Sequence, residues 1–245
     1  MVWDIVKIGI EDVEKVFNIQ DNLYQKYVED EIKKDKDLLN LINFRDSGVD
    51  WQKETPLGGM GTTLNACVLY CLVRYYGMSD ILETGVSGGY YSSFILSALS
   101  KSKDNSLGPM LKSLEISNDE KEIGKLVPES LKNTINVKWD KSFFGLDSLE
   151  YFRNLHTTKT HHEYDMYCHD SLHTMAHMTK ELNEFKQSQS NMYFIFIDDE
   201  KSDNFWTRSL QTNAFKRNGY SVKWISGNES RLKGHLGGFI FYVKS

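Results

Sequence analysis

The chain has 245 residues, is 40% hydrophobic and 26% charged, and carries a formal net charge of −5 at pH 7. This composition suffices for one large domain or two small ones. Its slight acidity disfavours long-range attraction to nucleic acids or to anionic membranes. No run approaches the roughly 18 apolar residues of a membrane span, and the first residues lack the features of a signal peptide. With only three cysteines, in apolar surroundings, we expect a cytoplasmic protein without disulfides.

Residues 1–60 differ in pattern from the rest of the chain. The stretch 11–42 is charged, and its apolar residues recur at roughly helical spacing. A segment containing Gly and Pro, 45–63, then breaks this pattern. We therefore expect an N-terminal helical extension over 1–60 and a main domain over 61–245. A helix from Thr63 to Tyr76, capped by Gly77, begins that domain.

Beyond Gly77, short apolar segments alternate with helical ones. Continuous apolar strands separated by helices predict a mostly parallel sheet with helices on both faces. The last two strands are too close in sequence for a helix between them, which favours an antiparallel hairpin. The predicted fold class is α/β, a Rossmann-like doubly wound sheet of seven strands. The expected strands are 80–84, 110–117, 134–139, 164–169, 192–199, 220–226 and 236–243.

Carboxylates lie at the ends of five predicted strands in a row. In open α/β sheets, ligands bind in the crevice outside the carboxyl ends of the strands. Acidic residues are common near turns, so any single one means little, but their recurrence at one edge predicts a site. The residues are Glu83, Glu115, Asp140, Asp170, and Asp198 with Asp199.

A glycine-rich turn follows the first strand and opens a helix, with the pattern Glu83-x-Gly85-x-Ser87-x-Gly89. Glycine lets the backbone turn tightly and approach a ligand, and the helix N-terminus offers free N–H groups. The pattern does not match the G-x-G-x-x-G of dinucleotide sites. A carboxylate two residues before the first glycine is unsuited to a pyrophosphate and suits a ligand with an ammonium group. A plain tight turn between strand and helix is the alternative.

Glu115 ends the second predicted strand. An acid there typically accepts hydrogen bonds from a ribose diol. Its spacing from Glu83 is longer than usual, and the segment 100–109 has the composition of a loop insertion that accounts for the excess. A surface acid is the alternative.

Together, the glycine-rich turn, Glu115 and the strand pattern resemble the class I S-adenosylmethionine-dependent methyltransferases, over roughly 62–243. The resemblance implies that Glu83 lies near the amino acid portion of S-adenosylmethionine and that Glu115 binds the ribose hydroxyls. It also implies that Gly85, Ser87 and Gly89 line the cofactor. Ser87 stands where many members of the family have glycine.

In these families the helix before the first strand packs over the cofactor. Met60, with Thr62 or Thr63, would then close the sulfonium pocket. The N-terminal helices would form a lid or the surface of a homodimer. An ordinary helix start is the alternative interpretation of this segment.

Asp170, Asp198 and Asp199 would converge if the fourth and fifth strands are neighbours, because adjacent strands lie about 4.8 Å apart. Such carboxylates repel one another unless a cation lies between them, and hard oxygen ligands suit Mg²⁺, Mn²⁺ or Ca²⁺. The arrangement resembles the metal-dependent O-methyltransferases of the catechol and caffeoyl-coenzyme A type and of macrolide sugars. Here His173 stands where those have Lys, and Asp199 where they have Asn.

The leading hypothesis is metal-assisted O-methylation of a small hydroxylated molecule, such as a sugar or glycan precursor. His173 would be the general base, with Asp170 also in the catalytic set. An active site without metal stays open, as does a purely structural role in which Asp170 caps a helix. A metal-free O- or N-methyltransferase and a non-catalytic S-adenosylmethionine-binding module are the alternative functions. No nucleic acid or membrane partner is expected.

Overall fold

The structure is a computed structural model that describes residues 2–47, 61–102, 108–158, 162–172, 174–187, 194–200, 220–225 and 238–244. The α-helices are α1 (Val2–Phe17), α2 (Lys36–Asp46), α4 (Thr63–Tyr76), α5 (Tyr90–Ser100), α6 (Glu129–Lys132), α7 (Ser148–Thr158) and α8 (Met175–Gln187). A π-helical turn, η1 (Tyr24–Glu29), and a 3₁₀ turn, η2 (Ile32–Lys34), connect α1 to α2. The strands are β1 (Asp80–Thr84), β2 (Met110–Glu115), β3 (Lys138–Phe144), β4 (Met166–His169), β5 (Phe194–Glu200), β6 (Tyr220–Ile225) and β7 (Gly238–Lys244).

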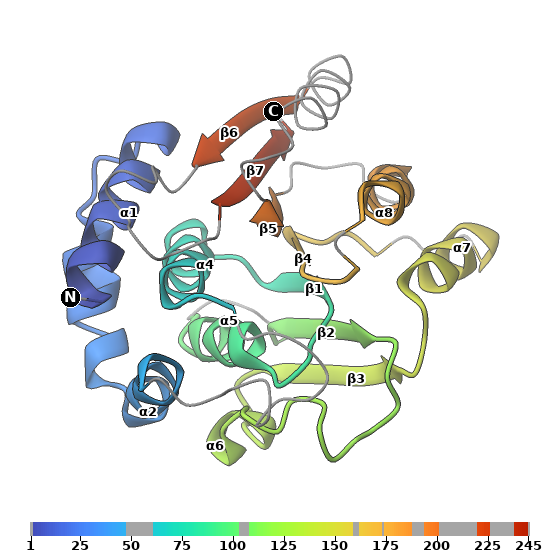
Figure 1. Cartoon of the computed structure of the whole chain (residues 1–245), viewed down its shortest axis with the longest axis horizontal. Helices are drawn as coiled ribbons and strands as arrows, with labels where there is room; N and C mark the ends of the chain where they lie inside the picture. Colours follow the sequence, from blue (N-terminus) through green and yellow to red (C-terminus); the bar gives the residue numbers. More distant parts are fainter. Residues whose placement is uncertain are drawn as a thin grey trace.

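The strands form one sheet in the order β3-β2-β1-β4-β5-β7-β6 (Figure 1). Strands β1 to β5 run parallel to one another, which confirms the predicted mostly parallel α/β sheet. Strand β7 pairs antiparallel with both β5 and β6. Residues 226–237 lie outside the described part, so the terminal hairpin stays a prediction.

Two hydrophobic cores flank the sheet, because successive side chains of a strand point to opposite faces. In β4, Met166 and Cys168 pack into the core completed by α1, α4 and α5. Tyr167 lies between them in sequence and packs into the second core, with side chains of α7 and α8. Figure 1 shows these two groups of helices on opposite sides of the sheet. The sheet is therefore covered on both faces, as the continuous apolar strands predict.

Helix α4 begins and ends where the sequence predicts. The side chain of Thr62 accepts a hydrogen bond from the backbone N–H of Asn65, at 3.1 Å from Oγ1, and so caps the first turn. Gly77 adopts the left-handed conformation, with φ of 62°, and its N–H bonds to the carbonyl of Val73. The start of this helix lies at the edge of the sheet where the candidate site is found, since Gly61 shares a pocket with Gly85 and Asp170.

The N-terminal helices pack directly onto α4. Val6, Ile10 and Val13 of α1 are fully buried in the same core as α4 and α5. Arg74 of α4 binds the Glu31 carboxylate through Nε and Nη2, both at 3.0 Å. Residues 2–47 thus share a core with the main domain, while their predicted role as a lid or dimer surface stays a prediction.

The predicted position of the third strand is wrong. The sequence predicts a strand over 134–139, whereas β3 begins at Lys138, and Ile135 is fully exposed. Strand β3 is at the edge of the sheet and only Asp140 in it is buried, so a search for continuous apolar residues misses it. Asp140 pairs in register with Lys112 in the middle of β2. It therefore lies within the strand and does not belong to the carboxyl edge.

Candidate functional site

The carboxyl ends of β1 and β4 meet at one edge of the sheet. Thr84 and His169, the last residues of these strands, are paired in register. The backbone N–H of Asp170 then donates to the carbonyl oxygen of Thr84 at 2.9 Å. Asp170 thus lies against the glycine-rich turn that follows β1, as the strand-end argument predicts.

The turn between β1 and α5 requires glycine at two points. Gly85 has φ of 81° and Gly89 has φ of 84°, a conformation that other residues adopt at a cost. A Cβ atom on Gly85 would collide with the backbone carbonyl of Asp170, and one on Gly89 would collide with Gly124 and Val127. The turn is therefore both left-handed and crowded by neighbouring backbone, which brings its own backbone close to the site.

Ser87 and Glu115 join this turn to the end of β2. Ser87 has φ of 47°, and its backbone N–H donates to Oε2 of Glu115 at 3.0 Å. Oε1 of Glu115 accepts from the N–H of Ser117 at 3.2 Å. An ionised carboxylate has about four acceptor positions, so Glu115 keeps capacity for a ligand. The hydroxyl of Ser87 is buried and makes no hydrogen bond to any residue that the structure describes.

Glu83 is 1% exposed and held by serines of two neighbouring elements. Ser92 Oγ lies 2.9 and 2.8 Å from the two carboxylate oxygens, and Ser113 Oγ donates to Oε2 at 2.7 Å. Burial raises the pKa of Glu83 to about 7, although the hydrogen bonds from Ser113 and Ser92 oppose it. The charges of Asp170 and Glu115 raise this pKa further. Glu83 is therefore poised near neutral pH and sensitive to any cation that binds nearby.

A pocket opens between the glycine-rich turn, the first turn of α5, the end of β4 and the start of α4. Its walls carry one carboxylate and two tyrosines and, within the described residues, no basic side chain. The predicted residues Gly85 and Asp170 line it, whereas Glu83, Ser87, Gly89 and Glu115 are not among its lining residues. The lining residues are Gly61, Gly85, Val86, Gly88, Tyr90, Tyr91 and Asp170.

Two tyrosines that the sequence analysis missed hold the segment before α4 over this pocket. The hydroxyl of Tyr91 accepts a hydrogen bond from the N–H of Thr62 at 3.0 Å, and the hydroxyls of Tyr90 and Thr63 lie 3.1 Å apart. The sequence feature that could have identified them is a pair of aromatic residues directly after a glycine-rich turn. These bonds place Thr62 and Thr63 beside two residues of the pocket wall, and the closure of a sulfonium pocket by Thr62 or Thr63 stays a prediction.

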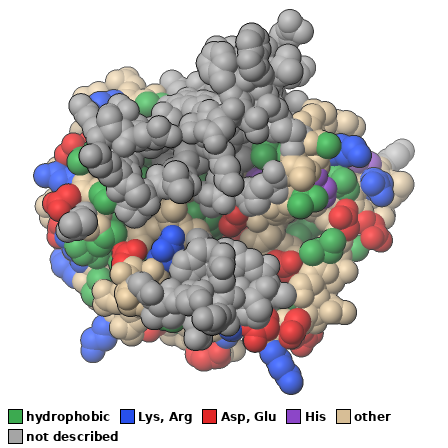
Figure 2. All heavy atoms as spheres, in the orientation of Figure 1, with side chains coloured by type: hydrophobic (Ala, Val, Ile, Leu, Met, Phe, Trp, Pro, Cys, Tyr) green, Lys and Arg blue, Asp and Glu red, His purple; other side chains and the backbone are tan. Residues whose placement is uncertain are grey.

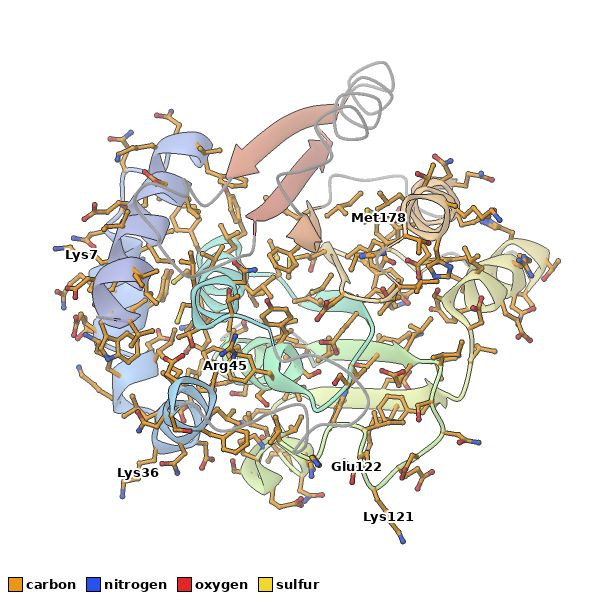
Figure 3. The ribbon with its side chains drawn as sticks, in the orientation of Figure 1. Lys7, Lys36, Arg45, Lys121, Glu122 and Met178 are labelled. Atoms are coloured by element: carbon orange, nitrogen blue, oxygen red, sulfur yellow. The ribbon has the colours of Figure 1, made fainter. Side chains whose placement is uncertain are left out.

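Arg45 reaches from α2 toward the same segment (Figure 3), and its Nε donates to the carbonyl of Gly61 at 2.9 Å. A Cβ atom on Gly61 would collide with the ring of Tyr91. The close packing of Gly61 on Tyr91 thus fixes where the chain enters α4. Met60, predicted to close the pocket, lies outside the described residues.

The predicted metal ligands come from strands that are neighbours in the sheet. β4 and β5 pair in register through His169 and Ile197, so Asp170 and Asp198 are the next residues along each strand. The side chains of Asp198 and Asp199 lie outside the described part, as does His173. Within the part of the chain that is described, no cluster of three His, Cys, Asp or Glu residues could hold a metal ion. The metal site stays a prediction.

A buried polar cluster lies on the opposite side of β4 from the pocket. The imidazole of His169 and the carboxylate of Glu181 are both 0% exposed, and Nε2 lies 2.7 Å from Oε2. Burial alone would raise the pKa of Glu181, but the contacts with His169, Ser148 and His177 together lower it. The sequence analysis missed Glu181, because an acid in the charged helix 175–187 is ordinarily solvated.

Comparison with known proteins finds similarity in structure alone. A scan against protein-family models finds no match, and a search of the curated proteins finds none. The O-methyltransferase from Bacillus cereus, solved in complex with S-adenosylhomocysteine, is 18% identical, with a TM-score of 0.56, over 90% of this chain and 96% of that one.

Two further solved structures are similar over comparable lengths. The O-methyltransferase TomG from Streptomyces achromogenes, in complex with S-adenosylmethionine, is 16% identical, with a TM-score of 0.56, over 89% of this chain and 93% of that one. The S-adenosylhomocysteine-bound methyltransferase PaMTH1 from Podospora anserina is 13% identical, with a TM-score of 0.55, over 86% of this chain and 89% of that one. The chain has the fold of these methyltransferases.

Proposed function

We propose that the pocket at the carboxyl edge of the sheet binds S-adenosylmethionine and that the chain methylates a hydroxyl group of a small molecule. The observation that carries the proposal is Glu115, whose carboxylate is held by Ser87 and Ser117 with acceptor capacity to spare. It stands beside a left-handed, glycine-rich turn. Solved methyltransferases of the same fold, with S-adenosylmethionine or its product bound, support the proposal.

The chemistry of the pocket fits this cofactor. S-adenosylmethionine carries a sulfonium and an ammonium group, and it supplies its methyl to a nucleophile by in-line displacement. The lining offers Asp170 and two tyrosines, with no basic side chain among the described lining residues. Aromatic faces and carboxylates favour cations. A pyrophosphate would meet the charges of Asp170 and Glu115 instead. The hydroxyl of Ser87 is buried without a hydrogen-bond partner among the described residues, which suits a polar ligand.

The residues of the site would act mainly by orienting the reactants. Glu115 would accept hydrogen bonds from the ribose hydroxyls. Gly85 and Gly89 let the turn pack against the backbone of Asp170 and of Gly124, which would hold the turn in place beside the cofactor. Tyr91, through its bond to Thr62, would hold the start of α4 against the cofactor and exclude water.

The acceptor side of the site would use Asp170, Asp198 and Asp199, with His173 as general base. The neighbouring strands β4 and β5 and the oxygen donors of these three residues support a divalent cation, Mg²⁺ or alternatively Mn²⁺ or Ca²⁺. A cation bound there would lower the pKa of the acceptor hydroxyl. His173 would then remove a proton that is already acidified.

A metal-free O- or N-methyltransferase is the second candidate. It needs only the cofactor half of the site, in which Glu115 and the glycine-rich turn are held by contacts within the described part of the chain. In that case Glu83 and Glu115 stay essential, whereas Asp198 and Asp199 become dispensable. A binding module without turnover would keep the same cofactor pocket.

A small hydroxylated molecule, such as a sugar or glycan precursor, is the acceptor class we propose. On the face shown in Figure 2, acidic and basic described side chains are interspersed, which does not suit a long polyanion. Within the described residues, no helix is long and apolar enough to cross a membrane. The N-terminal helices would serve as a lid or as the contact surface of a homodimer.

A transfer assay tests the proposal. Purified protein is incubated with labelled S-adenosylmethionine and a panel of catechols, sugars and amines, with Mg²⁺ or with a chelator. Asp198→Ala is compared with Asp119→Ala, which replaces an exposed acid after β2. We expect label to be transferred to a hydroxylated acceptor. This transfer should be lost with chelator and in Asp198→Ala, and it should be retained in Asp119→Ala. Transfer that survives both conditions supports the metal-free candidate, and binding without any transfer contradicts an enzyme.

A further inference from the structure

One buried carboxylate joins three segments of the chain behind the site: the end of β4 with its following loop, the start of α7, and α8. Glu181 of α8 is 0% exposed. His169 Nε2 lies 2.7 Å from its Oε2, and His177 Nε2 lies 3.2 Å from its Oε1. Ser171 Oγ donates to both oxygens, at 3.1 and 2.9 Å, and Ser148 Oγ donates to Oε1. These four donors match the acceptor capacity of an ionised carboxylate.

The two residues that flank Asp170 are both bound to Glu181. His169 and Ser171 reach the carboxylate, while Asp170 between them lines the pocket. Neighbouring residues of an extended chain point to opposite sides, so one segment meets the buried cluster and the pocket at once. The backbone N–H of Asp170 also donates to the carbonyl oxygen of Thr84 at 2.9 Å, which ties the same residue to the end of β1.

We infer that Glu181 is a positioning residue that fixes Asp170 and the start of the β4–α8 loop on the acceptor side of the pocket. The inference rests on the proposed function for the meaning of Asp170. Glutamine at this position would present an N–H group to one set of donors. Either His169, or Ser148 with His177, would then lose its acceptor, and Ser171 would bind one oxygen where it now binds two.

The chain offers a matched control on the same helix. Glu184 lies three residues beyond Glu181, and its Oε2 is 3.0 Å from Nε2 of His156 on α7. Both pairs join a glutamate of α8 to a histidine. The pair of His156 and Glu184 is about one-third exposed, and among the described residues it makes no hydrogen bond or ion pair with the loop after β4.

The test compares Glu181→Gln, Ser171→Ala and Glu184→Gln with the wild type, by residue-resolved amide hydrogen exchange and by calorimetric titration of S-adenosylmethionine. We expect Glu181→Gln to speed the exchange of Asp170, Ser171 and Leu172 by about tenfold or more, with the turn 85–89 unchanged. Its Kd for S-adenosylmethionine stays within about twofold of the wild type, because Glu115 and the turn are held separately. Ser171→Ala gives a smaller increase in the same residues, and Glu184→Gln gives none.

Two results would overturn the inference. One is unchanged exchange in the loop in both Glu181→Gln and Ser171→Ala. The other is an equal increase across β1, α5 and the loop, which would indicate general loss of stability. With an acceptor from the transfer assay, Glu181→Gln should lower kcat about tenfold while KM for S-adenosylmethionine stays constant. If the wild type binds no S-adenosylmethionine, the proposed function fails, and the exchange data still decide whether Glu181 holds Asp170.

Discussion

The carboxylate of Glu115 accepts a hydrogen bond from the backbone N–H of Ser87 at 3.0 Å, which ties the end of β2 to the turn after β1. Both residues come from elements that the sequence predicts at the carboxyl edge of the sheet. Their contact leaves Glu115 partly satisfied by protein and directed toward the turn. The cofactor half of the proposed site is built on this relationship.

Glu115→Gln should weaken S-adenosylmethionine binding by about 10- to 100-fold, or about 1.4–2.8 kcal/mol, because a charged acceptor for a diol is replaced by a neutral one. Titration calorimetry on both proteins measures the change. Glu120→Gln, an exposed acid in the loop after β2, is the control and should bind as the wild type does. Equal affinity for Glu115→Gln and wild type would exclude Glu115 as a ligand.

Gly85→Ala should unfold at a much lower denaturant concentration than the wild type. The added Cβ would both strain a φ of 81° and collide with the carbonyl of Asp170, at a combined cost of about 3 kcal/mol or more. Gly77→Ala tests the conformational part alone, since φ is 62° there and no atom lies within 4 Å. The free energy of unfolding of Gly77→Ala should fall by only about 1 kcal/mol.

Urea unfolding monitored by tryptophan fluorescence compares the two variants. Because the Asp170 carbonyl crowds Gly85, we expect a clearly larger loss of unfolding free energy for Gly85→Ala than for Gly77→Ala. Similar losses in both would mean that the backbone of Asp170 does not lie against the turn.

The pKa of Glu83 makes stability depend on pH. Its folded-state pKa is about 7, against 4.5 as the ordinary value. Between these values the folded state binds more protons than the unfolded state, so stability falls as pH rises. The loss is on the order of 3 kcal/mol and is complete above about pH 7.

Unfolding of wild type and Glu83→Gln between pH 5 and 8 isolates this contribution. The stability of the wild type relative to Glu83→Gln should decrease from pH 5 to about pH 7 and then level off. A difference that stays constant with pH would show that Glu83 ionises normally. Glu120→Gln again serves as the control, and its difference from the wild type should not change with pH.

Glu31→Gln tests whether the N-terminal helices belong to the folded core. Glu31 binds Arg74 twice at 3.0 Å and accepts from the Tyr70 hydroxyl at 2.6 Å, with side chains of Glu31 and Arg74 about one-fifth exposed. Loss of the Glu31 carboxylate should lower the free energy of unfolding by about 2 kcal/mol, which is less than for a fully buried ion pair. Asp30→Asn, which breaks the exposed pair of Asp30 with Lys34 at 2.8 Å, should leave the unfolding midpoint unchanged.

Unfolding of these two variants, followed by far-UV circular dichroism and by tryptophan fluorescence, tests whether residues 2–47 unfold together with the main domain. A single transition that shifts in Glu31→Gln indicates one cooperative unit. An early separate transition of the helical signal would indicate that residues 2–47 unfold on their own.

Local patterns in the sequence predict the elements that bear the cofactor half of the site. The segment 80–84 is a strand because it is apolar and short, and α4 has both a threonine cap and a terminal glycine. The strand β3 was misplaced because an edge strand does not need continuous apolar residues. The hydrophobic period of an element and the capping residues of a helix depend on neighbours in sequence, and for that reason both could be predicted.

Contacts between distant residues could not be predicted. Glu83 is buried because Ser92 and Ser113 supply its hydrogen bonds, and Ser113 lies on another strand, 30 residues away in sequence. Glu181 in a charged helix gives no sign that His169 reaches it across the fold. The roles of such groups follow from tertiary packing, which composition and periodicity do not specify.

The central claim is that the pocket lined by Gly85, Tyr91 and Asp170 binds S-adenosylmethionine. Titration calorimetry of S-adenosylmethionine into the wild-type protein, followed by displacement with S-adenosylhomocysteine, tests it most directly. We expect one-to-one binding with a Kd below about 1 mM and full displacement by the product. Absence of binding under these conditions, or binding that S-adenosylhomocysteine does not displace, would contradict the claim.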